Sequence, residues 1–297
     1  MVEDVMWLEL HVKTTAEHAN QIGDQLTLLG ATALTMQDAG DQPIYEPALD
    51  ATPLWQDTIV VGLFDDQQTM EPILAYLKRQ QALGLLKDFQ LQPLADQDWE
   101  RRCLDDLKPL CFGKRLWVCP SWLTPPEPEA VNVILDPGLA FGTGTHPTTS
   151  LCLEWLDANI KSGDTVIDYG CGSGILAIAA LKLGANQVMA IDHDPQALDA
   201  TRQNGERNQL APSELKTCLP DDFVPQQVDV VIANILAKPL IELAPRLSTF
   251  VKQGGQILLS GILIEQAEHV AEAYKPWFLM KNSVSKQEWV RLEGVRK

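Results

Sequence analysis

Residues 165–174, with the sequence TVIDYGCGSG, decide the fold of this 297-residue chain. An apolar strand ends at Asp168, three glycines follow at alternate positions, and the run ILAIAALKLGA after them predicts a helix. Glycine lets the backbone turn sharply and approach a ligand closely, because it has no Cβ atom. The segment therefore predicts a strand, a ligand-binding turn and a helix, as at the start of a parallel α/β sheet.

The same alternation of short apolar strands and helices continues to the end of the chain. In chain order we predict strands at residues 165–168, 188–191, 228–233 and 256–260, helices at 174–183, 195–208, 238–251 and 265–274, and two antiparallel edge strands around 278–284 and 288–292. Near-continuous apolar strands that alternate with helices are typical of a parallel sheet covered on both faces. We therefore expect a Rossmann-like, doubly wound, seven-stranded α/β domain over residues 131–297.

The first third of the chain has a different order of elements. It predicts strands at residues 5–12, 31–36, 58–64 and 86–94 and helices at 15–29 and 68–80, with Gly30 closing the first helix. The order βαββαβ is typical of a small ferredoxin-like α+β domain, here residues 1–95. We interpret the following segment as a linker, residues 96–130, with a short helix at 98–107, the beginning of a strand at 115–118 and a proline-rich turn at 124–129.

The negative charge of the chain is concentrated in that first third. Residues 1–100 hold 17 acidic and 4 basic side chains, the remainder holds 23 and 19, and the formal net charge is −17. An acidic surface repels phosphate groups, which disfavours unaided binding to nucleic acid or to an anionic membrane. The excess charge is either a solubility feature or a docking surface for a basic partner, and the sequence leaves both interpretations open.

The N-terminus and the cysteines bear on location and on metal binding. The segment MVEDVMWLELHV carries acidic residues where a signal peptide has a basic start. The longest apolar runs, residues 175–181 and 257–264, are shorter than the roughly 20 residues that span a bilayer. The six cysteines form no CxxC pair and have no histidine cluster beside them, so we expect no zinc site and reduced thiols in the cytoplasm.

The acidic residue at the end of the next strand indicates a nucleoside-containing cofactor. Asp192 lies 22 residues after Gly170, at a spacing where a carboxylate accepts hydrogen bonds from ribose hydroxyls. Asp168, at the mouth of the glycine loop, would repel a pyrophosphate and attract a cation, and the glycines follow GxGxG rather than the GxGxxG of dinucleotide sites. S-adenosylmethionine, with its sulfonium and ammonium groups and no phosphate, fits best. The competing interpretation is a tight turn with a capping aspartate.

Two further segments extend the predicted site. LDPGLAFGTGTHPTTS, residues 135–150, is a Gly/Thr-rich loop that runs into a helix with its N-cap near Thr148 or Thr149. Phe141 would supply an apolar contact and the threonines would supply hydrogen bonds, although an N-cap alone also explains this pattern. The strand VDVVIAN ends at Asn234, where an uncharged amide is placed to orient the methionyl part of the cofactor or an incoming amine.

These motifs resemble those of a known family. AFGTGTHPTT, DYGCGSGILAIAA, ANIL and LSGIL follow one another in the order and spacing of the ribosomal protein L-eleven methyltransferases, class I enzymes that use S-adenosylmethionine. The resemblance covers the C-terminal domain closely and extends to the acidic first domain. DxGxGxG alone would indicate only the methyltransferase superfamily, whereas the combination of four motifs is specific.

The resemblance implies an activity, a partner and a set of site residues. It implies transfer of methyl groups from S-adenosylmethionine to the N-terminal α-amine and the lysine ε-amines of a large-subunit ribosomal protein. It also implies that the acidic first domain recognises this substrate, and a basic ribosomal protein would be attracted by its charge. The cofactor residues that it implies are Thr149, Gly170, Asp192 and Asn234, with Phe141, Thr143, Asp168 and Gly172 beside them.

The implied reaction makes few demands on catalytic side chains. A neutral amine displaces an already activated sulfonium, so the protein mainly orients the amine and removes it from water. No residue stands out as a general base, since a loop histidine bonded to the backbone explains His146 equally well. Asn234 is the candidate for orienting the amine, and without a heptad pattern or an exposed apolar stripe we expect a monomer.

Three other functions stay open. An RNA or DNA methyltransferase, or another protein N-methyltransferase, would use the same cofactor, but Asn234 is followed by Ile235 and Leu236 instead of a Pro-Pro-aromatic run. The chain also lacks a basic patch interleaved with aromatic residues. An NAD-dependent oxidoreductase would have to accept a pyrophosphate beside Asp168. A cofactor-binding regulator without catalysis would carry the same motifs.

Overall fold

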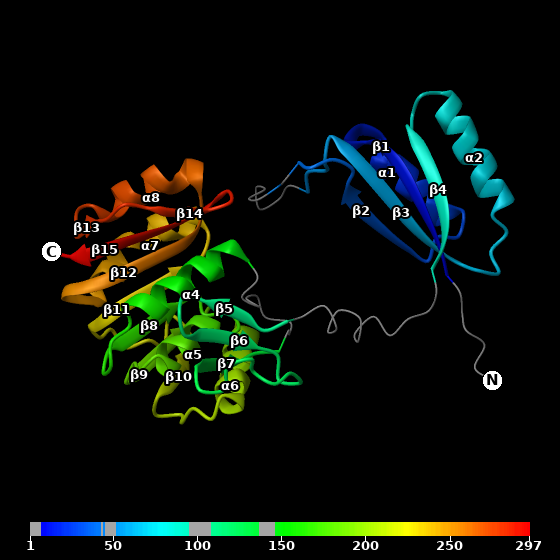
Figure 1. The fold of residues 1–297 in the computed structure, drawn as a ribbon. Helices are drawn as coiled ribbons and strands as arrows, with labels where there is room; N and C mark the ends of the chain where they lie inside the picture. The colour runs from blue at the N-terminus through cyan, green and yellow to red at the C-terminus, as the bar shows by residue number, and fades with distance from the viewer. Residues whose placement is uncertain (1–6, 43, 45–51, 95–107, 137–145) are drawn as a thin grey trace. The chain divides into compact units, whose positions relative to one another are not determined.

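The computed structural model describes residues 7–42, 44, 52–94, 108–136 and 146–297 (Figure 1). The chain divides into two compact units, Met1–Leu104 and Asp105–Lys297. The short helix predicted at residues 98–107 lies outside the described residues. Each unit has its own sheet and its own hydrophobic core.

The first unit is a four-stranded antiparallel sheet with two helices (Figure 1). Its elements are β1 (Trp7–Thr15), α1 (Ala16–Leu28), β2 (Ala33–Asp38), β3 (Asp57–Asp65), α2 (Glu71–Ala82) and β4 (Asp88–Leu94). The strand order β2-β3-β1-β4 and the antiparallel pairings confirm the predicted βαββαβ, ferredoxin-like arrangement. Gly30 follows α1 with φ +105°, and its N–H donates to the Thr27 carbonyl, so it ends the helix as predicted.

The core of the first unit lies on one face of its sheet. Leu10 and Val12 of β1 are fully buried, whereas Lys13 between two buried neighbours is exposed. Ile22 of α1 and Leu77 of α2 belong to the same cluster as these strand residues. Both helices therefore cover the same face, and the period-two alternation of the strands follows from that arrangement.

The second unit is built around an eight-stranded sheet. Its first elements are β5 (Leu110–Phe112), β6 (Leu116–Cys119), β7 (Val131–Ile134), α4 (Pro147–Asn159), β8 (Thr165–Tyr169), α5 (Ile175–Lys182), β9 (Gln187–Ile191), α6 (Pro195–Arg207) and β10 (Leu215–Cys218). It continues with β11 (Val228–Asn234), α7 (Ala237–Thr249), β12 (Val251–Leu263), the 3₁₀ turn η1 (Ile264–Gln266), α8 (Ala267–Tyr274), β13 (Phe278–Met280), β14 (Val284–Lys286) and β15 (Trp289–Arg296).

The strand order confirms the predicted doubly wound sheet. Seven strands follow the path β10-β9-β8-β11-β12-β15-β13, and the short β14 pairs with β15 beside it. The strands from β10 to β12 are parallel, and β15 joins them antiparallel. The edge strand β10 is absent from the strands predicted by hydrophobic pattern, because its sequence LKTC has no apolar run.

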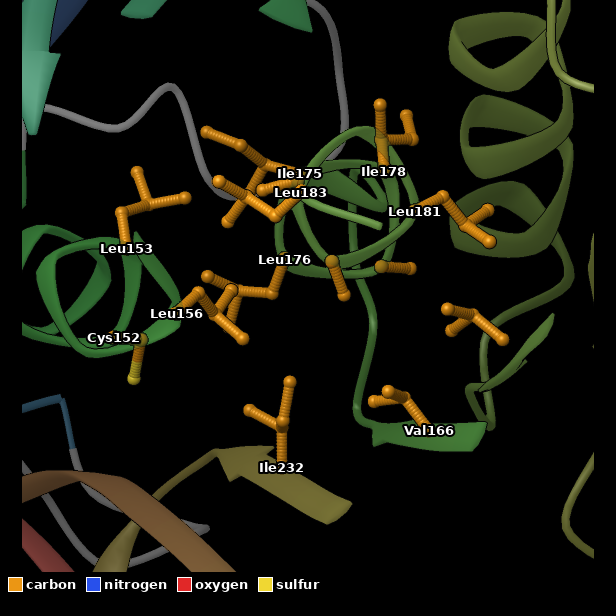
Figure 2. Packing of buried hydrophobic residues seen from close by; sticks show 14 of the residues in the cluster. Cys152, Leu153, Leu156, Val166, Ile175, Leu176, Ile178, Leu181, Leu183 and Ile232 are labelled. Carbon is orange, nitrogen blue, oxygen red and sulfur yellow. The ribbon is translucent and has the colours of Figure 1, made fainter. Parts of the chain in front are cut away.

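The central strands bury neighbouring residues on opposite faces of the sheet. Val166 of β8 and Ile232 of β11 pack into a cluster beneath α4 and α5, where Figure 2 shows them below Leu176. Ile167 and Val231, their neighbours along the chain, pack into a second cluster with α7 and α8. Because both faces are covered, the strands are apolar at consecutive positions rather than at alternate ones.

Within residues 96–130, β6 confirms the predicted beginning of a strand at residues 115–118, but the segment is more than a linker. β5, β6 and β7 form a three-stranded sheet, antiparallel between β5 and β6 and parallel between β6 and β7. Phe112, Leu116 and Val118 are buried in the same cluster as Leu176. Short strands interrupted by prolines gave a linker pattern in the sequence, but their apolar side chains complete the core of the second unit.

Candidate functional site

A cavity of about 600 Å³ lies at the carboxyl ends of the parallel strands. Tyr169 is the last residue of β8, Asp192 follows β9, and Asn234 is the last residue of β11. Ligands of open α/β sheets bind in the crevice outside these strand ends. The described lining residues are His146, Thr148, Tyr169, Gly170, Asp192, His193, Pro220, Asn234, Ile235, Leu236, Pro239, Leu243, Gly261 and Trp289.

The loop between β8 and α5 requires its glycines for two reasons. Gly170, Gly172 and Gly174 have φ angles of +80°, +53° and +78°, in the left-handed region that favours glycine. A Cβ atom on Gly170 would also lie 2.3 Å from Cγ2 of Ile235. The N–H groups of Gly170 and Cys171 donate to the carbonyl oxygen of Ile191, at 2.7 and 3.1 Å, which holds the loop against β9.

Asp192 connects the glycine loop with the cavity. Its Oδ2 accepts a hydrogen bond from the Gly172 N–H at 2.9 Å, and its Oδ1 accepts one from the Asp194 N–H at 3.0 Å. Oδ1 also lies 3.4 Å from Nδ1 of His193, and Oδ2 has a second lone pair with which it can accept from a ligand hydroxyl. The structure thus brings together Gly170, Gly172 and Asp192, which the sequence analysis predicted as cofactor residues.

Asn234 and Thr149 also meet at this edge of the sheet. Asn234 Nδ2 donates to Thr149 Oγ1 at 3.4 Å, and Thr149 is buried in the first turn of α4. The N-cap of α4 is His146, whose side chain accepts from the Thr148 N–H, and not Thr148 or Thr149 as predicted. Pro147 occupies the first position of α4, a position that proline favours, so the helix begins before Thr148 and Thr149.

Asp168 lies beneath the loop rather than at its mouth. Its side chain is fully buried, and Oδ2 accepts a hydrogen bond from the Ala177 N–H of α5 at 3.0 Å. Oδ1 is buried and has no hydrogen-bond partner among the residues that the structure describes. The pKa of this carboxyl is raised from 3.8 to about 7, mainly by burial and also by the negative charge of Asp192, while the hydrogen bond from Ala177 acts in the opposite direction. Asp168 therefore points toward α5 and is not among the described residues that line the cavity, and its predicted contact with a cation stays a prediction.

An aromatic pair closes one side of the cavity. The rings of His146 and Trp289 have centroids 4.9 Å apart and an interplanar angle of 66°, an edge-to-face contact. Burial lowers the pKa of His146, and Trp289 Nε1 donates to Glu288 Oε1 at 3.1 Å. No sequence motif pointed to Trp289, which reaches the cavity because β15 pairs with β12. The predicted contacts of Phe141 and Thr143 lie outside the described residues.

Comparison with known proteins identifies the family. The family model described as "Ribosomal protein L11 methyltransferase (PrmA)" matches residues 6–297. The chain belongs to this family. It is 50% identical over 294 residues to the ribosomal protein L11 methyltransferase of Marinobacter nauticus, covering 98% of this chain and 99% of that protein. It is 52% identical over 292 residues to the protein of that name from Shewanella denitrificans, with the same coverage.

A solved structure supports the same conclusion. The crystal structure of a ribosomal protein L11 methylase from Lactobacillus delbrueckii subsp. bulgaricus is similar with a TM-score of 0.59 and 34% identity. The matched region covers 64% of this chain and 100% of the chain in the crystal structure. The family resemblance read from the motifs is confirmed, and so is the Rossmann-like fold of a class I methyltransferase.

The described residues show two further properties of the methyltransferase. None of its described helices is long and apolar enough to cross a membrane. Over the same residues, no three His, Cys, Asp or Glu side chains gather in a way that could hold a metal ion. Cys152 and Cys171 are buried thiols in this part of the chain, and burial raises the pKa of both.

Proposed function

We propose that this methyltransferase transfers methyl groups from S-adenosylmethionine to the N-terminal α-amine and lysine ε-amines of ribosomal protein L11. The observation that carries the proposal is the cavity at the strand ends, where Asp192, the glycine loop and Asn234 meet. The substrate follows from the names of relatives that are about half identical over nearly the whole chain.

The chemistry of the cavity wall fits S-adenosylmethionine better than a dinucleotide. Its described lining contains the carboxylate of Asp192 but no lysine or arginine. A pyrophosphate would need compensating positive charge or free helix N–H groups, whereas a cationic amino-acid cofactor does not. The volume of about 600 Å³ lies within the usual range for pockets that enclose a ligand of this size.

Five of the predicted site residues have a role in this proposal. Asp192 accepts the ribose hydroxyls, and Gly170 lets the backbone approach the cofactor closely. Asn234, with Thr149 behind it, presents an amide to the amino-acid part or to the incoming amine. Asp168 supports the loop from below through the N-terminus of α5. S-adenosylmethionine, when bound, supplies a methyl group on a positively charged sulfur.

The rest of the cavity favours a neutral acceptor amine. A lysine with a pKa of about 10.4 is almost entirely charged at neutral pH. Leu236, Pro239, Leu243 and Trp289 give the cavity an apolar wall. Removal from water disfavours the ammonium form and lowers the pKa of the amine, so this wall promotes the nucleophilic form without a dedicated base.

The acidic first unit fits a basic partner. With 17 acidic and 4 basic side chains in residues 1–100, its field would attract a basic ribosomal protein and raise the rate of encounter. We assign substrate recognition to this unit and the reaction to the cytoplasm, where ribosomal proteins are made. The enzyme acts as a monomer in this proposal.

Methyl transfer from radiolabelled S-adenosylmethionine tests the proposal directly. Purified ribosomal protein L11, other ribosomal proteins and ribosomal RNA are offered as acceptors, and label is expected in ribosomal protein L11 alone. Label in the RNA fraction would replace the proposal with RNA methylation. Calorimetric titration with S-adenosylmethionine and with NAD gives the second readout, and tighter binding of NAD would contradict the cofactor assignment.

A further inference from the structure

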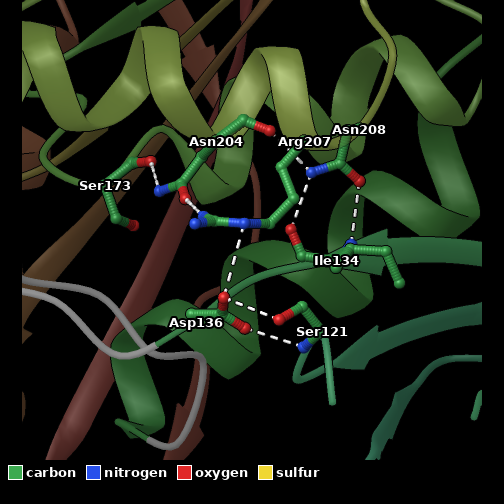
Figure 3. Close-up of polar contacts among 7 residues, drawn as sticks. All are labelled: Ser121, Ile134, Asp136, Ser173, Asn204, Arg207 and Asn208. Atoms are coloured by element: carbon green, nitrogen blue, oxygen red, sulfur yellow. Dashed lines mark hydrogen bonds and ion pairs between the residues drawn. The ribbon is translucent and has the colours of Figure 1, made fainter. Parts of the chain in front are cut away.

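Helix α6 carries a polar network that the proposed chemistry has not used (Figure 3). Asn204 and Asn208 are buried amides on the side of α6 that faces the glycine loop and β7. In the sequence these residues belong to RQNGERN, which has the composition of an exposed helix surface. Buried amides need hydrogen-bond partners, and the partners of these two identify what α6 connects.

One end of the network holds the glycine loop. Asn204 Nδ2 donates to the Ser173 carbonyl at 2.8 Å, and Thr201 Oγ1 donates to the Gly172 carbonyl at 3.0 Å. The Gly172 N–H points to Asp192, with which it makes a hydrogen bond of 2.9 Å. Side chains of α6 thus donate hydrogen bonds to the carbonyl groups of the loop. On its other side, the loop donates a hydrogen bond from the Gly172 N–H to Asp192, the proposed acceptor for the ribose hydroxyls.

The other end of the network binds β7 and Asp136, which lies two residues after this strand. Arg207 Nη1 donates to Asn204 Oδ1 at 2.6 Å, and its Nε lies 3.4 Å from Asp136 Oδ2. Asp136 in turn accepts from the N–H and the hydroxyl of Ser121, at 2.7 and 2.8 Å. Asn208 accepts from the N–H of Ile134 at 2.8 Å and donates to its carbonyl at 2.7 Å.

We propose that Asn204 and Arg207 are positioning residues for cofactor binding, which fix the glycine loop relative to Asp136 at the end of β7. This inference rests on the proposed use of S-adenosylmethionine. Three loop glycines with positive φ give the chain many alternative conformations, and a loop that must be ordered by its ligand binds it more weakly. The contacts from Asp136 to Arg207, from Arg207 to Asn204 and from Asn204 to Ser173 form a relay, and this relay orders the loop before the cofactor binds.

The partial exposure of the Arg207–Asp136 ion pair distinguishes a positioning role from a purely structural one. The Arg207 and Asp136 side chains are 36% and 22% exposed, and ion pairs of this exposure contribute little to folding stability. Breaking the pair therefore affects the order of the loop more than the fold. If Arg207 had a structural role, its substitution would lower the melting temperature. If it is a positioning residue, its substitution changes the Kd and KM for S-adenosylmethionine and leaves kcat unchanged.

The test uses the full-length chain with Arg207→Met and Arg207→Lys. We expect Arg207→Met to raise the Kd for S-adenosylmethionine about fivefold, the effect of losing roughly one hydrogen bond. The KM for the cofactor rises by the same factor, kcat at saturating cofactor stays unchanged, and circular dichroism shows the wild-type fold. Arg207→Lys keeps the charge opposite Asp136 but loses the fork geometry, so it recovers part of the affinity.

A control and a double variant complete the test. Arg202→Met changes another arginine of α6, one that pairs with Asp199 and donates to Thr217, and it should bind the cofactor as the wild type does. Asp136→Asn should weaken binding alone but add little to Arg207→Met, because both break the same relay. Should Arg207→Met not fold, Asn204→Asp replaces it, since it keeps an acceptor for Arg207 and loses the donor to Ser173.

The outcomes distinguish this inference from the proposed function. A wild-type protein that does not bind S-adenosylmethionine refutes the proposed function. A wild type that binds, together with folded Arg207 variants of equal affinity, overturns the positioning role alone. A fall in kcat at unchanged KM would also overturn it, because it would place Arg207 in the chemical step.

Discussion

The two units of the chain bury their sheets in different ways. In the first unit, β1 alternates between buried Leu10 and Val12 and the exposed Lys13, since helices cover one face of the sheet. In the second unit, Val166 and Ile167 of β8 are both buried, in clusters on opposite faces. A sheet covered on one side keeps a wide surface for a partner, whereas one covered on both sides leaves its strand ends for chemistry.

The charge of the two units follows the same division. Most of the excess negative charge belongs to residues 1–100, while the second unit is closer to neutral and holds the cavity. Long-range attraction acts on a partner that is still approaching, and short-range hydrogen bonds act on a ligand already in place. We therefore expect changes in the first unit to affect encounter with the substrate and changes in the second to affect the cofactor.

Removal of the first unit is expected to have the largest effect, and it should separate encounter with the substrate from cofactor binding. A chain that begins at Asp105 retains Gly170, Asp192 and Asn234 and should bind S-adenosylmethionine as tightly as the full chain. Methylation of ribosomal protein L11 should fall at least about a hundredfold, because electrostatic steering alone changes association rates by factors of this order. Calorimetry and a methyl-transfer assay measure the two effects, after circular dichroism has shown that the fragment folds. A folded fragment with the full-length methylation rate would make the acidic charge a solubility feature.

A β-carbon at Gly170 should have the next largest effect. Gly170→Ala combines a positive φ with a Cβ atom 2.3 Å from Ile235, and we expect about thirtyfold weaker cofactor binding from strain and overpacking together. Gly163→Ala is the matched control, since Gly163 also has a positive φ, +91°, but an added Cβ would meet nothing within 4 Å. Equal cofactor affinities of the two variants would show that the close approach at Gly170 has no role.

Loss of the Asp192 carboxylate should weaken cofactor binding about tenfold or more. A hydrogen bond to a charged acceptor contributes about 1.5–3 kcal/mol, and Asp192→Ala removes the acceptor for the ribose hydroxyls. The variant also leaves the Gly172 and Asp194 N–H groups without their acceptor. The comparison is made by calorimetry with Asp199→Ala, an exposed residue of the same unit. Unchanged affinity for Asp192→Ala would remove this residue from the site.

The smallest expected effect is a pH-dependent change in stability at Asp168. Its pKa is about 7 in the folded protein and 3.8 without burial, so ionisation is harder in the folded state. The wild type therefore loses stability as the pH rises from about 4 to about 7, and this loss persists above pH 7. Asp168→Asn has no charge to bury, so its melting temperature relative to the wild type should be a few degrees higher at pH 8 than at pH 5.

Thermal melts at both pH values test this, with Asp221→Asn at an exposed position as the control. A difference between variant and wild type that stays the same at both pH values would mean that Asp168 keeps an ordinary pKa in the fold.

The hydrophobic pattern predicted strands only where it was strong. Apolar runs such as VDVVIAN identified β11, because a strand buried on both faces must be apolar throughout. β10 was missed, since an edge strand with the sequence LKTC needs few apolar residues, and only its pairing with β9 reveals it. β5 was missed because a strand of three residues carries too little pattern, and β6 was predicted as the beginning of a strand at residues 115–118 but assigned to a linker.

The same contrast applies to the site. Glycines at fixed spacing and an acid 22 residues after Gly170 identified the loop and Asp192, since both depend on local backbone geometry and on strand order. Trp289 and Arg207 gave no such signal. Trp289 lies on a strand that joins the sheet antiparallel. Arg207 reaches Asp136 because the C-terminal end of α6 is hydrogen-bonded to β7 through Asn208.

The amino-acid pattern alone was enough to predict the strongly apolar strands and the helices between them, the glycine loop, the acidic residue that follows it and the concentration of negative charge in the first third. These features depend on hydrophobic periodicity, on the φ angles that only glycine adopts readily and on composition. Only the tertiary structure decided which way Asp168 points, what the buried amides of α6 bind and which aromatic residues line the cavity. Such contacts join residues far apart in the chain, and no local pattern encodes a distance that packing sets.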